Sequence, residues 1–218
     1  MAEGFVLGSP PHVLLEINDR TPEPRKIRQA TSALERGEVI AYPTDAAYAL
    51  GCDLENKKAI DRLQQLKGLA KSQRLSFLCS DLRNVSKYAV MHDRVFRVLK
   101  AFLPGPYTFV LEATREVPRV IQSKRKTVGV RIPDSPVALA LVEELGRPII
   151  TTTAARHGAA PLVDPAEIDD EFPGLALVLD GGPGGTEPTS IIDLTSPTPE
   201  VLREGAGDVE AFLASIRS

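Results

Sequence analysis

The sequence predicts one α/β domain built on a mixed β-sheet, and three observations support this fold class. The 218 residues are enough for one large domain, and 43% hydrophobic with 25% charged residues is ordinary globular composition. Segments with helical spacing of apolar residues alternate with short apolar runs, without a separate helical half. The stretches 107–132 and 175–203 place strands in succession with short connections, which predicts antiparallel pairs within the sheet.

The first half of the chain predicts an edge strand followed by alternating helices and strands. Proline flanks and short length favour an edge strand or an extended arm at 13–17. Asn56 is a typical helix cap, and Gly37 and Gly68 are typical helix ends. The expected elements are a helix from 21–24 to Gly37, a strand at 38–42, a helix from Asn56 to Gly68, a strand at 75–79 and a helix at 92–103.

The second half predicts more strands than helices. Asp134 is expected to cap a helix that ends at Gly146, and the pattern then returns to strands. The expected elements are strands at 107–113 and 127–132, the helix from Asp134 to Gly146, a strand at 148–152, a helix at 165–171, strands at 175–180, 190–194 and 200–203, and a terminal helix at 208–216. We expect an N-terminal arm (1–24), the main domain (25–206) and a C-terminal helix of the same domain (207–218).

The charge balance argues against a molecule that binds polyanions over its whole surface. The net charge is −3 with a pI near 5.7, so any such site must be local. Residues 115–131 are one candidate for such a local site, because their basic residues are opposed only by Glu116. These basic residues are Arg115, Arg119, Lys124, Arg125, Lys126 and Arg131. The compensating acidic residues lie at 164–171.

The cysteines, histidines and apolar runs indicate a reduced, cytoplasmic protein. Two cysteines cannot form a disulfide framework, and Cys52 and Cys79 lie in apolar surroundings typical of core residues. Three histidines far apart in sequence do not predict a metal site, and His157 is expected to be an exposed loop residue. No N-terminal leader pattern and no apolar run near the ~18 residues of a membrane span are present.

The segment 42–52 is the first that points to a ligand site. A strand ending in Pro43-Thr44-Asp45 places backbone N–H groups and a hydroxyl at its carboxyl end, where open α/β sheets usually bind ligands. Taken alone, Thr44 and Asp45 are also typical helix caps, so this segment leaves both interpretations open.

Several further segments, in the same order, give the sequence a resemblance to the YrdC/YciO-like family over about residues 25–206. They are Tyr42–Asp53, Leu103–Phe109, Thr127–Pro133, Thr151–Thr153, Pro188–Asp193 and Leu202–Gly205. The segments 75–79 and 124–127 resemble the YciO branch. The resemblance implies a YrdC-like single domain, with a mixed twisted sheet and flanking helices around a concave basic cleft.

The resemblance also implies an activity. Enzymes of the family make threonylcarbamoyl-AMP from L-threonine, bicarbonate and ATP, release pyrophosphate, and so begin the t6A modification of tRNA. This chemistry requires a carboxylate and a triphosphate held side by side, with their charge offset by Lys, Arg, backbone N–H groups and Mg²⁺ bound with ATP. It requires no nucleophilic side chain.

Site residues follow from the same resemblance. Lys67 and Arg131 are the expected catalytic residues, and an Arg fork suits a substrate carboxylate. The expected substrate-binding residues are Thr44, Arg131, Thr153, Thr189 and Ser190. The expected nucleotide-binding residues are Lys67, Arg74, Lys124, Arg125, Thr127, Thr151 and Arg203. For Arg131 the alternative is a surface salt bridge.

Two positions depart from the pattern of the active relatives. Their Lys-x-Arg corresponds here to Lys67-Gly68-Leu69, and their Ser-x-Asn corresponds to Thr153-Ala154-Ala155. Losing an arginine and an amide costs about 1–3 kcal/mol of ligand or transition-state binding each. The departures therefore predict weak activity or a different amino-acid-like substrate.

Two other functions stay open from the sequence. The first is a module that binds double-stranded RNA or tRNA without synthase activity, with Lys124-Arg125-Lys126 either gripping phosphates or forming a solvated hairpin. The second is a small-molecule-binding protein that has lost its chemistry. The glycine run 181–185 matches no phosphate-binding motif and is either a loop at the cleft or a plain connection.

Overall fold

The computed structural model describes residues 14–68, 75–118, 121, 125–156 and 158–217. The strands in this part of the chain are β1 (Leu14–Glu16), β2 (Ile40–Tyr42), β3 (Ala49–Asp53), β4 (Ser76–Leu78), β5 (Tyr107–Glu112), β6 (Thr127–Arg131), β7 (Ile149–Thr153), β8 (Leu177–Asp180), β9 (Ser190–Asp193) and β10 (Glu200–Arg203). The helices are α1 (Pro24–Glu35), α2 (Lys57–Leu66), α3 (Leu82–Tyr88), α4 (Asp93–Phe102), α5 (Pro136–Leu145), α6 (Pro165–Glu171) and α7 (Val209–Arg217).

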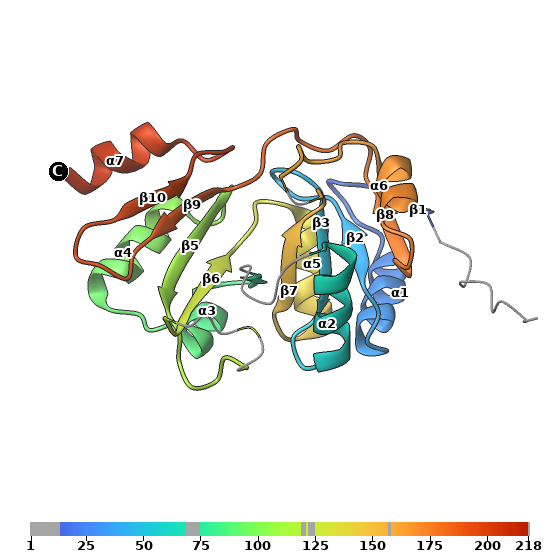
Figure 1. Cartoon of the computed structure of the whole chain (residues 1–218), viewed down its shortest axis with the longest axis horizontal. Helices are drawn as coiled ribbons and strands as arrows, with labels where there is room; N and C mark the ends of the chain where they lie inside the picture. The colour runs from blue at the N-terminus through green and yellow to red at the C-terminus, as the bar shows by residue number, and fades with distance from the viewer. Residues whose placement is uncertain (1–13, 69–74, 119–120, 122–124, 157, 218) are drawn as a thin grey trace, which may run out of the picture.

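All of these strands form one mixed sheet, which confirms the predicted fold class (Figure 1). The strand order is β1-β8-β2-β3-β7-β4-β6-β5-β9-β10. The predicted antiparallel pairs are present as β5 with β6 and β9 with β10. β8 does not pair with β9, because it runs parallel to β1 and β2 at the other end of the sheet. The β8–β9 connection therefore crosses the molecule, and β1 forms an edge strand within the segment expected to be an arm.

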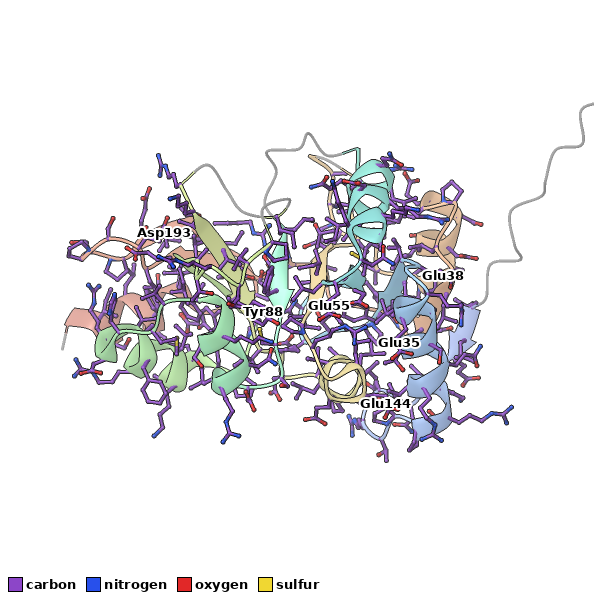
Figure 2. The ribbon with its side chains drawn as sticks, turned by 90° about the horizontal axis from the view of Figure 1, so that it is seen from below. Glu35, Glu38, Glu55, Tyr88, Glu144 and Asp193 are labelled. Atoms are coloured by element: carbon purple, nitrogen blue, oxygen red, sulfur yellow. The ribbon has the colours of Figure 1, made fainter. Side chains whose placement is uncertain are left out.

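The helices cover the two faces of the sheet unequally. Figure 1 shows α2 in front of the strands and α5 behind them, and Figure 2 shows α1 and α5 beside each other, marked by Glu35 and Glu144. α1 and α5 bury one smaller apolar cluster against β2, β3, β4, β7 and β8. The other helices bury the larger cluster, which holds Leu50, Phe77, Phe109 and Val130 from alternate strand positions. The cluster under α1 and α5 contains no residue of β5, β9 or β10. The face of the sheet that α1 and α5 cover is therefore not packed by this cluster at these three strands.

Most helix ends lie where the sequence predicts them, because caps are local. The Asn56 side chain accepts a hydrogen bond from Ala59 N at 3.1 Å, and Gly146 ends α5 in the left-handed conformation with φ 70°. The predicted cap at Asp134 is wrong. Ser135 caps α5 instead, because Pro136 occupies the first helical position and Ser135 Oγ accepts from Ala138 N at 3.4 Å.

Two elements are not anticipated by the sequence pattern. α3 has seven residues, of which only Val85 and Tyr88 are buried, so its apolar spacing is too short to stand out. β3 is buried at every position, and most of it lies inside the segment 42–52, for which the sequence leaves a ligand site or a helix cap open. Both elements take their stability from the larger apolar cluster.

Candidate functional site

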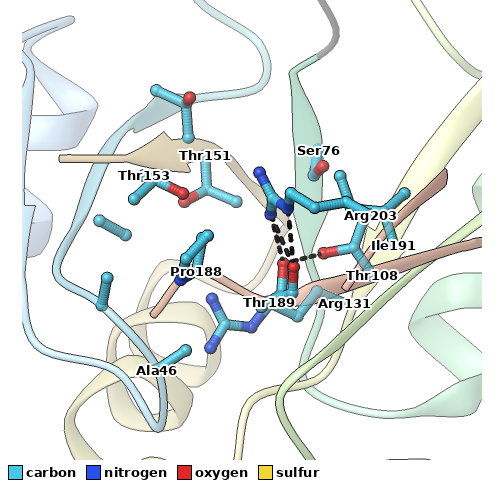
Figure 3. Close-up of a pocket in the computed structure, with 13 residues that line it drawn as sticks. Ala46, Ser76, Thr108, Arg131, Thr151, Thr153, Pro188, Thr189, Ile191 and Arg203 are labelled. Carbon is cyan, nitrogen blue, oxygen red and sulfur yellow. Dashed lines mark hydrogen bonds between the residues drawn. The ribbon is translucent and has the colours of Figure 1, made fainter. Parts of the chain in front are cut away.

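A polar cavity opens in the middle of the sheet, where residues far apart in sequence meet (Figure 3). Its volume is about 80 Å³. Its wall is formed by Ala46, Ala47, Ala49, Ser76, Thr108, Arg131, Thr151, Thr152, Thr153, Pro188, Thr189, Ile191 and Arg203. Hydroxyl groups and two guanidinium groups dominate this wall, which suits a small anionic ligand.

The cavity exists because one face of the sheet changes from apolar to polar along neighbouring strands. On β4 and β7, Leu78 and Ile149 lie in the apolar cluster beneath α5. Two residues away on the same face, Ser76 and Thr151 line the cavity and pair across the two strands. Gly129 pairs with Ser76 on the next strand, and a Cβ at Gly129 would lie 2.8 Å from Ser76 Oγ. Glycine therefore keeps this side of the cavity open.

Arg131 is buried, and its partners come from the segment that follows β2. Its Nη2 group forms an ion pair with Asp45 Oδ1 and donates a hydrogen bond to Thr44 Oγ1 at 3.0 Å. The side chains of Arg131 and Asp45 are only 7% and 8% exposed, so the pair is not a surface salt bridge. Thr44 Oγ1 also accepts from Ala46 N at 3.1 Å and donates to Ala47 O at 2.7 Å. The strand-end segment and Arg131 thus form one connected wall.

Arg203 enters the cavity from β10 and is held by neutral groups (Figure 3). Its Nε and Nη2 groups donate to Thr189 O at 2.9 and 2.7 Å. The Thr189 hydroxyl lies 2.9 Å from that of Thr108 and 3.2 Å from Arg203 Nη2. Within the described residues, Arg203 has no carboxylate partner, and burial together with the charge of Arg131 lowers its pKa. Arg203 is therefore a cation without a countercharge at the cavity.

Thr151 lines the cavity and Ser190 does not, although both are predicted site residues. Thr151 lines the cavity, accepts a hydrogen bond from Tyr42 Oη at 2.8 Å and donates to Leu50 O at 3.3 Å. Ser190 is fully buried, and its hydroxyl donates to Gly207 O and accepts from Gly205 N. The Ser190 hydroxyl does not line the cavity, so it holds the loop after β10.

Lys67 lies at the end of α2 and bonds to the backbone at the end of β7 and just beyond it. Its Nζ group donates to Thr153 O at 2.8 Å and also to Ala155 O. Its side chain is not part of the cavity wall, although Thr153 is. Burial, with a smaller contribution from the charge of Arg156, lowers the pKa of Lys67 to about 8. Lys67 therefore anchors the segment that carries the second departure from the family pattern.

Comparisons with known proteins agree with this geometry. The family model described as "Telomere recombination", which covers Sua5, YciO and YrdC proteins, matches residues 32–205. The chain belongs to the Sua5/YciO/YrdC family. The uncharacterized protein YciO of Escherichia coli (strain K12) is 43% identical over 200 residues, which are 90% of this chain and 97% of YciO. The crystal structure of E. coli YciO matches 93% of this chain and 98% of its own with a TM-score of 0.87.

Threonylcarbamoyl-AMP synthases are more distant relatives. The synthase of Photobacterium profundum is 32% identical over 184 residues, covering 82% of this chain and 98% of the synthase. The crystal structure of P. abyssi Sua5 complexed with L-threonine is 29% identical, with a TM-score of 0.88. That match covers 94% of this chain and 61% of Sua5. The family is thus established, and the resemblance stated from the sequence is confirmed.

The remaining predicted nucleotide-binding residues of this family member are not gathered around the cavity. Neither Arg125 nor Thr127 lines the wall. Arg125 is exposed, and Thr127 is the first residue of β6, four residues before Arg131. Arg74 and Lys124 lie outside the described residues, as do Leu69 and His157.

Sequence reasoning missed four residues that shape the site. From the sequence, Asp45 is the end of a strand segment or a helix cap, although an acid next to Thr44 is the natural partner of a buried arginine. Thr108 and Ser76 are single polar positions in otherwise apolar strands, and that break in the pattern is a usable signal. Arg156 donates to Leu66 O at 2.9 Å and pairs with Glu171 at 2.5 Å, which joins the ends of α2 and α6.

The glycine run 181–185 contacts the wall of the cavity. Tyr48 Oη donates to Gly182 O at 2.8 Å and accepts from Gly181 N at 3.1 Å, and Gly185 N donates to Ala46 O at 3.1 Å. A Cβ at Gly184 would collide with the Tyr48 ring. The run is therefore a close-packed connection that holds the segment 42–48 in place.

The two cysteines lie in the protein interior, and the described residues contain no cluster of metal ligands. Cys52 and Cys79 are buried free thiols, and burial raises their pKa. No group of three or more His, Cys, Asp or Glu side chains in the described part could hold a metal ion. In the same part, no helix has the length and apolar character needed to cross a membrane.

The pKa of Lys67 gives a test of its burial. The folded-state pKa of about 8 lies below the ordinary value of 10.5, so between these pH values the unfolded chain binds more protons and stability rises with pH. We expect the native protein to gain about 2 kcal/mol relative to Lys67→Met between pH 8 and pH 10. Urea unfolding at both pH values measures the difference. Lys58→Met, which removes an exposed lysine of the same helix, is the control for the loss of one positive charge.

Proposed function

We propose that this chain is a threonylcarbamoyl-AMP-synthase-like nucleotidyltransferase, which converts L-threonine, bicarbonate and ATP to threonylcarbamoyl-AMP and pyrophosphate for t6A modification of tRNA. The main support is the cavity between Arg131 and Arg203, which gathers two guanidinium groups and several hydroxyls from separate strands. Similarity to a threonylcarbamoyl-AMP synthase and to a Sua5 structure complexed with L-threonine supports the same substrates.

The amino-acid part of the reaction is assigned to Arg131 in the cavity wall and to Thr44, which accepts a hydrogen bond from it. A guanidinium donates charge-assisted hydrogen bonds to a carboxylate, and these are about twice as strong as neutral ones. Thr189 and Thr108 share a hydrogen bond within the same wall and offer hydroxyls to the substrate. The pocket volume of about 80 Å³ favours a small amino acid.

The nucleotide part is assigned to Arg203 and Lys67. In the reaction, an oxygen of the threonine carbamate attacks the α-phosphorus of ATP, a P–O bond forms, and the bond to pyrophosphate breaks. Arg203 has no carboxylate countercharge among the described residues, so it is suited to the developing negative charge. Mg²⁺ bound with ATP would offset part of the charge of the triphosphate.

The same residues argue for slow turnover. Lys67 already donates to Thr153 O and Ala155 O, which leaves one ammonium hydrogen for a phosphate. Ala155 has no amide side chain to replace the asparagine of the active relatives. We therefore place this chain among the family members with weak activity or with another small amino acid as substrate.

Mass spectrometry of a reaction containing ATP, L-threonine, bicarbonate and Mg²⁺ tests the proposal. We expect a threonylcarbamoyl-AMP peak that requires all of these components, together with released pyrophosphate. The test variant is Thr189→Val, from which we expect less product than from the native protein. It keeps the shape of the side chain and removes the hydroxyl that bonds to Arg203 and Thr108. Product at native level from this variant, or no product from the native protein with any small amino acid, would contradict the proposal.

An RNA-binding module is the second candidate, and the exposure of Arg115, Arg125 and Lys126 near β6 favours it. Exposed basic side chains bind a phosphate backbone and release counterions. Under this alternative, the mass-spectrometric assay yields no product, while tRNA or double-stranded RNA is retained on a filter with a steep dependence on salt.

A further inference from the structure

Two buried polar atoms beside the cavity lack hydrogen-bond partners, and they belong to the same ion pair. Within the described residues, the buried atoms without a partner include Asp45 Oδ2 and Arg131 Nε. Their neighbours Asp45 Oδ1 and Arg131 Nη2 are in direct contact. Leaving a buried donor or acceptor without a partner is costly, so both atoms are expected to serve a purpose.

The geometry of a guanidinium explains why these atoms occur together. Nε and Nη2 lie on one edge of the planar group and match the two oxygens of a carboxylate. Asp45 makes one contact with this group, from Oδ1 to Nη2, and Oδ2 and Nε are not bonded to each other, so the two-bond fork is incomplete. The opposite group, Nη1, makes no hydrogen bond to the described residues and is not among the buried unpartnered atoms. It is therefore the part of Arg131 that reaches the cavity.

We infer that Asp45 is a positioning residue, which neutralises Arg131 and turns its Nη1 group toward the ligand. The inference rests on the proposed binding of an amino-acid carboxylate. Arg131 and Asp45 together carry no net charge, and Arg203 then supplies the net positive charge of the cavity. Such a cavity takes a ligand with one carboxylate in a fixed direction, and it disfavours a compact dianion that would need two free cations.

The test compares two probes, L-threonine and inorganic phosphate, on the Asp45→Asn variant. Asparagine has nearly the same shape but no charge, so Arg131 loses its countercharge and the ion pair that fixes the orientation of its guanidinium. We expect L-threonine affinity to fall roughly tenfold, because a charge-assisted orienting contact is lost. We expect phosphate affinity to rise by about fivefold, because two cations now face the cavity without a countercharge. Calorimetric titration measures both.

Asp53→Asn is the matched control. Asp53 is 3% exposed and forms a two-bond ion pair with Arg147 at 2.8 and 2.5 Å, at the opposite end of β3 from Ala49. This variant removes a carboxylate of the same kind away from the cavity. It should lower the unfolding temperature and leave both affinities unchanged.

Asp45→Glu separates charge from position and also covers the case in which Asp45→Asn does not fold. Glutamate keeps the countercharge but displaces the guanidinium by one methylene. We expect weaker L-threonine binding with unchanged phosphate binding. Affinities for both probes that move in the same direction in Asp45→Asn, or L-threonine affinity that is unchanged in folded Asp45→Glu, would overturn the inference.

The phosphate measurements also keep this inference separate from the proposed function. If native protein binds no L-threonine, the proposed function fails, but the role of Asp45 is still decided by phosphate. A gain of phosphate affinity in Asp45→Asn then supports it, and no gain contradicts it.

Discussion

Arg131→Ala is expected to remove amino-acid binding and also to destabilise the fold. The loss of a charge-assisted carboxylate contact should weaken L-threonine binding roughly 100-fold. The partner carboxylate, Asp45, is then left buried without its countercharge, which typically costs about 3–5 kcal/mol. From the sequence, the alternative for Arg131 is a surface salt bridge, and the 7% exposure of its side chain excludes that alternative.

Calorimetric titration with L-threonine and urea unfolding measure the two effects separately. The double variant Arg131→Ala with Asp45→Ala serves as the control, because it removes both charges together. It should recover much of the lost stability without recovering L-threonine binding. A stable single variant that binds L-threonine at native affinity would remove Arg131 from the site.

Gly205→Ala is expected to produce the second large effect, through the wall of the cavity. Gly205 N donates to Ser190 Oγ at 2.9 Å, and a Cβ at this position would collide with Pro188 O and lie 2.9 Å from Thr189 C and O. These are backbone atoms, which cannot move aside as the end of a flexible side chain does. Overpacking of this kind costs about 1–3 kcal/mol.

The displaced segment carries Thr189, whose carbonyl oxygen holds Arg203. We therefore expect the Gly205→Ala protein to lose nucleotide and L-threonine affinity in addition to stability. Gly182→Ala is the control, because a Cβ there meets nothing within 4 Å and only its φ of 89° is strained. That variant should be mildly destabilised with native ligand affinities. Native affinity in Gly205→Ala would show that the 188–190 segment does not form the site.

The fold was largely predictable because its signals are local. Asn56 and Gly146 act within a few residues of their own positions, and apolar spacing marks the longer helices. α3 and β3 were missed because a short helix and a fully buried strand carry no distinct periodicity. The cap at Ser135 was missed because two neighbouring residues, Asp134 and Ser135, are both good caps.

The candidate site was predictable only in part, because its contacts join distant residues. The resemblance to a family names Thr44, Thr151, Thr153, Thr189, Arg131 and Arg203, all of which either line the cavity or bond to its wall. The pairing of Asp45 with Arg131 and the anchoring of Lys67 to Ala155 O span more than 80 residues each. No periodicity or motif records such contacts, since they arise only when the strands are assembled.

The most direct measurement of the central claim is a crystal structure of this protein grown with saturating L-threonine. The account predicts the amino acid between Arg131 and Arg203, with its carboxylate within hydrogen-bonding distance of Arg131 Nη1, and with Asp45 Oδ1 still in contact with Arg131 Nη2. L-threonine bound elsewhere, or a ligand carboxylate that displaces Asp45 from Arg131 Nη2, would contradict it.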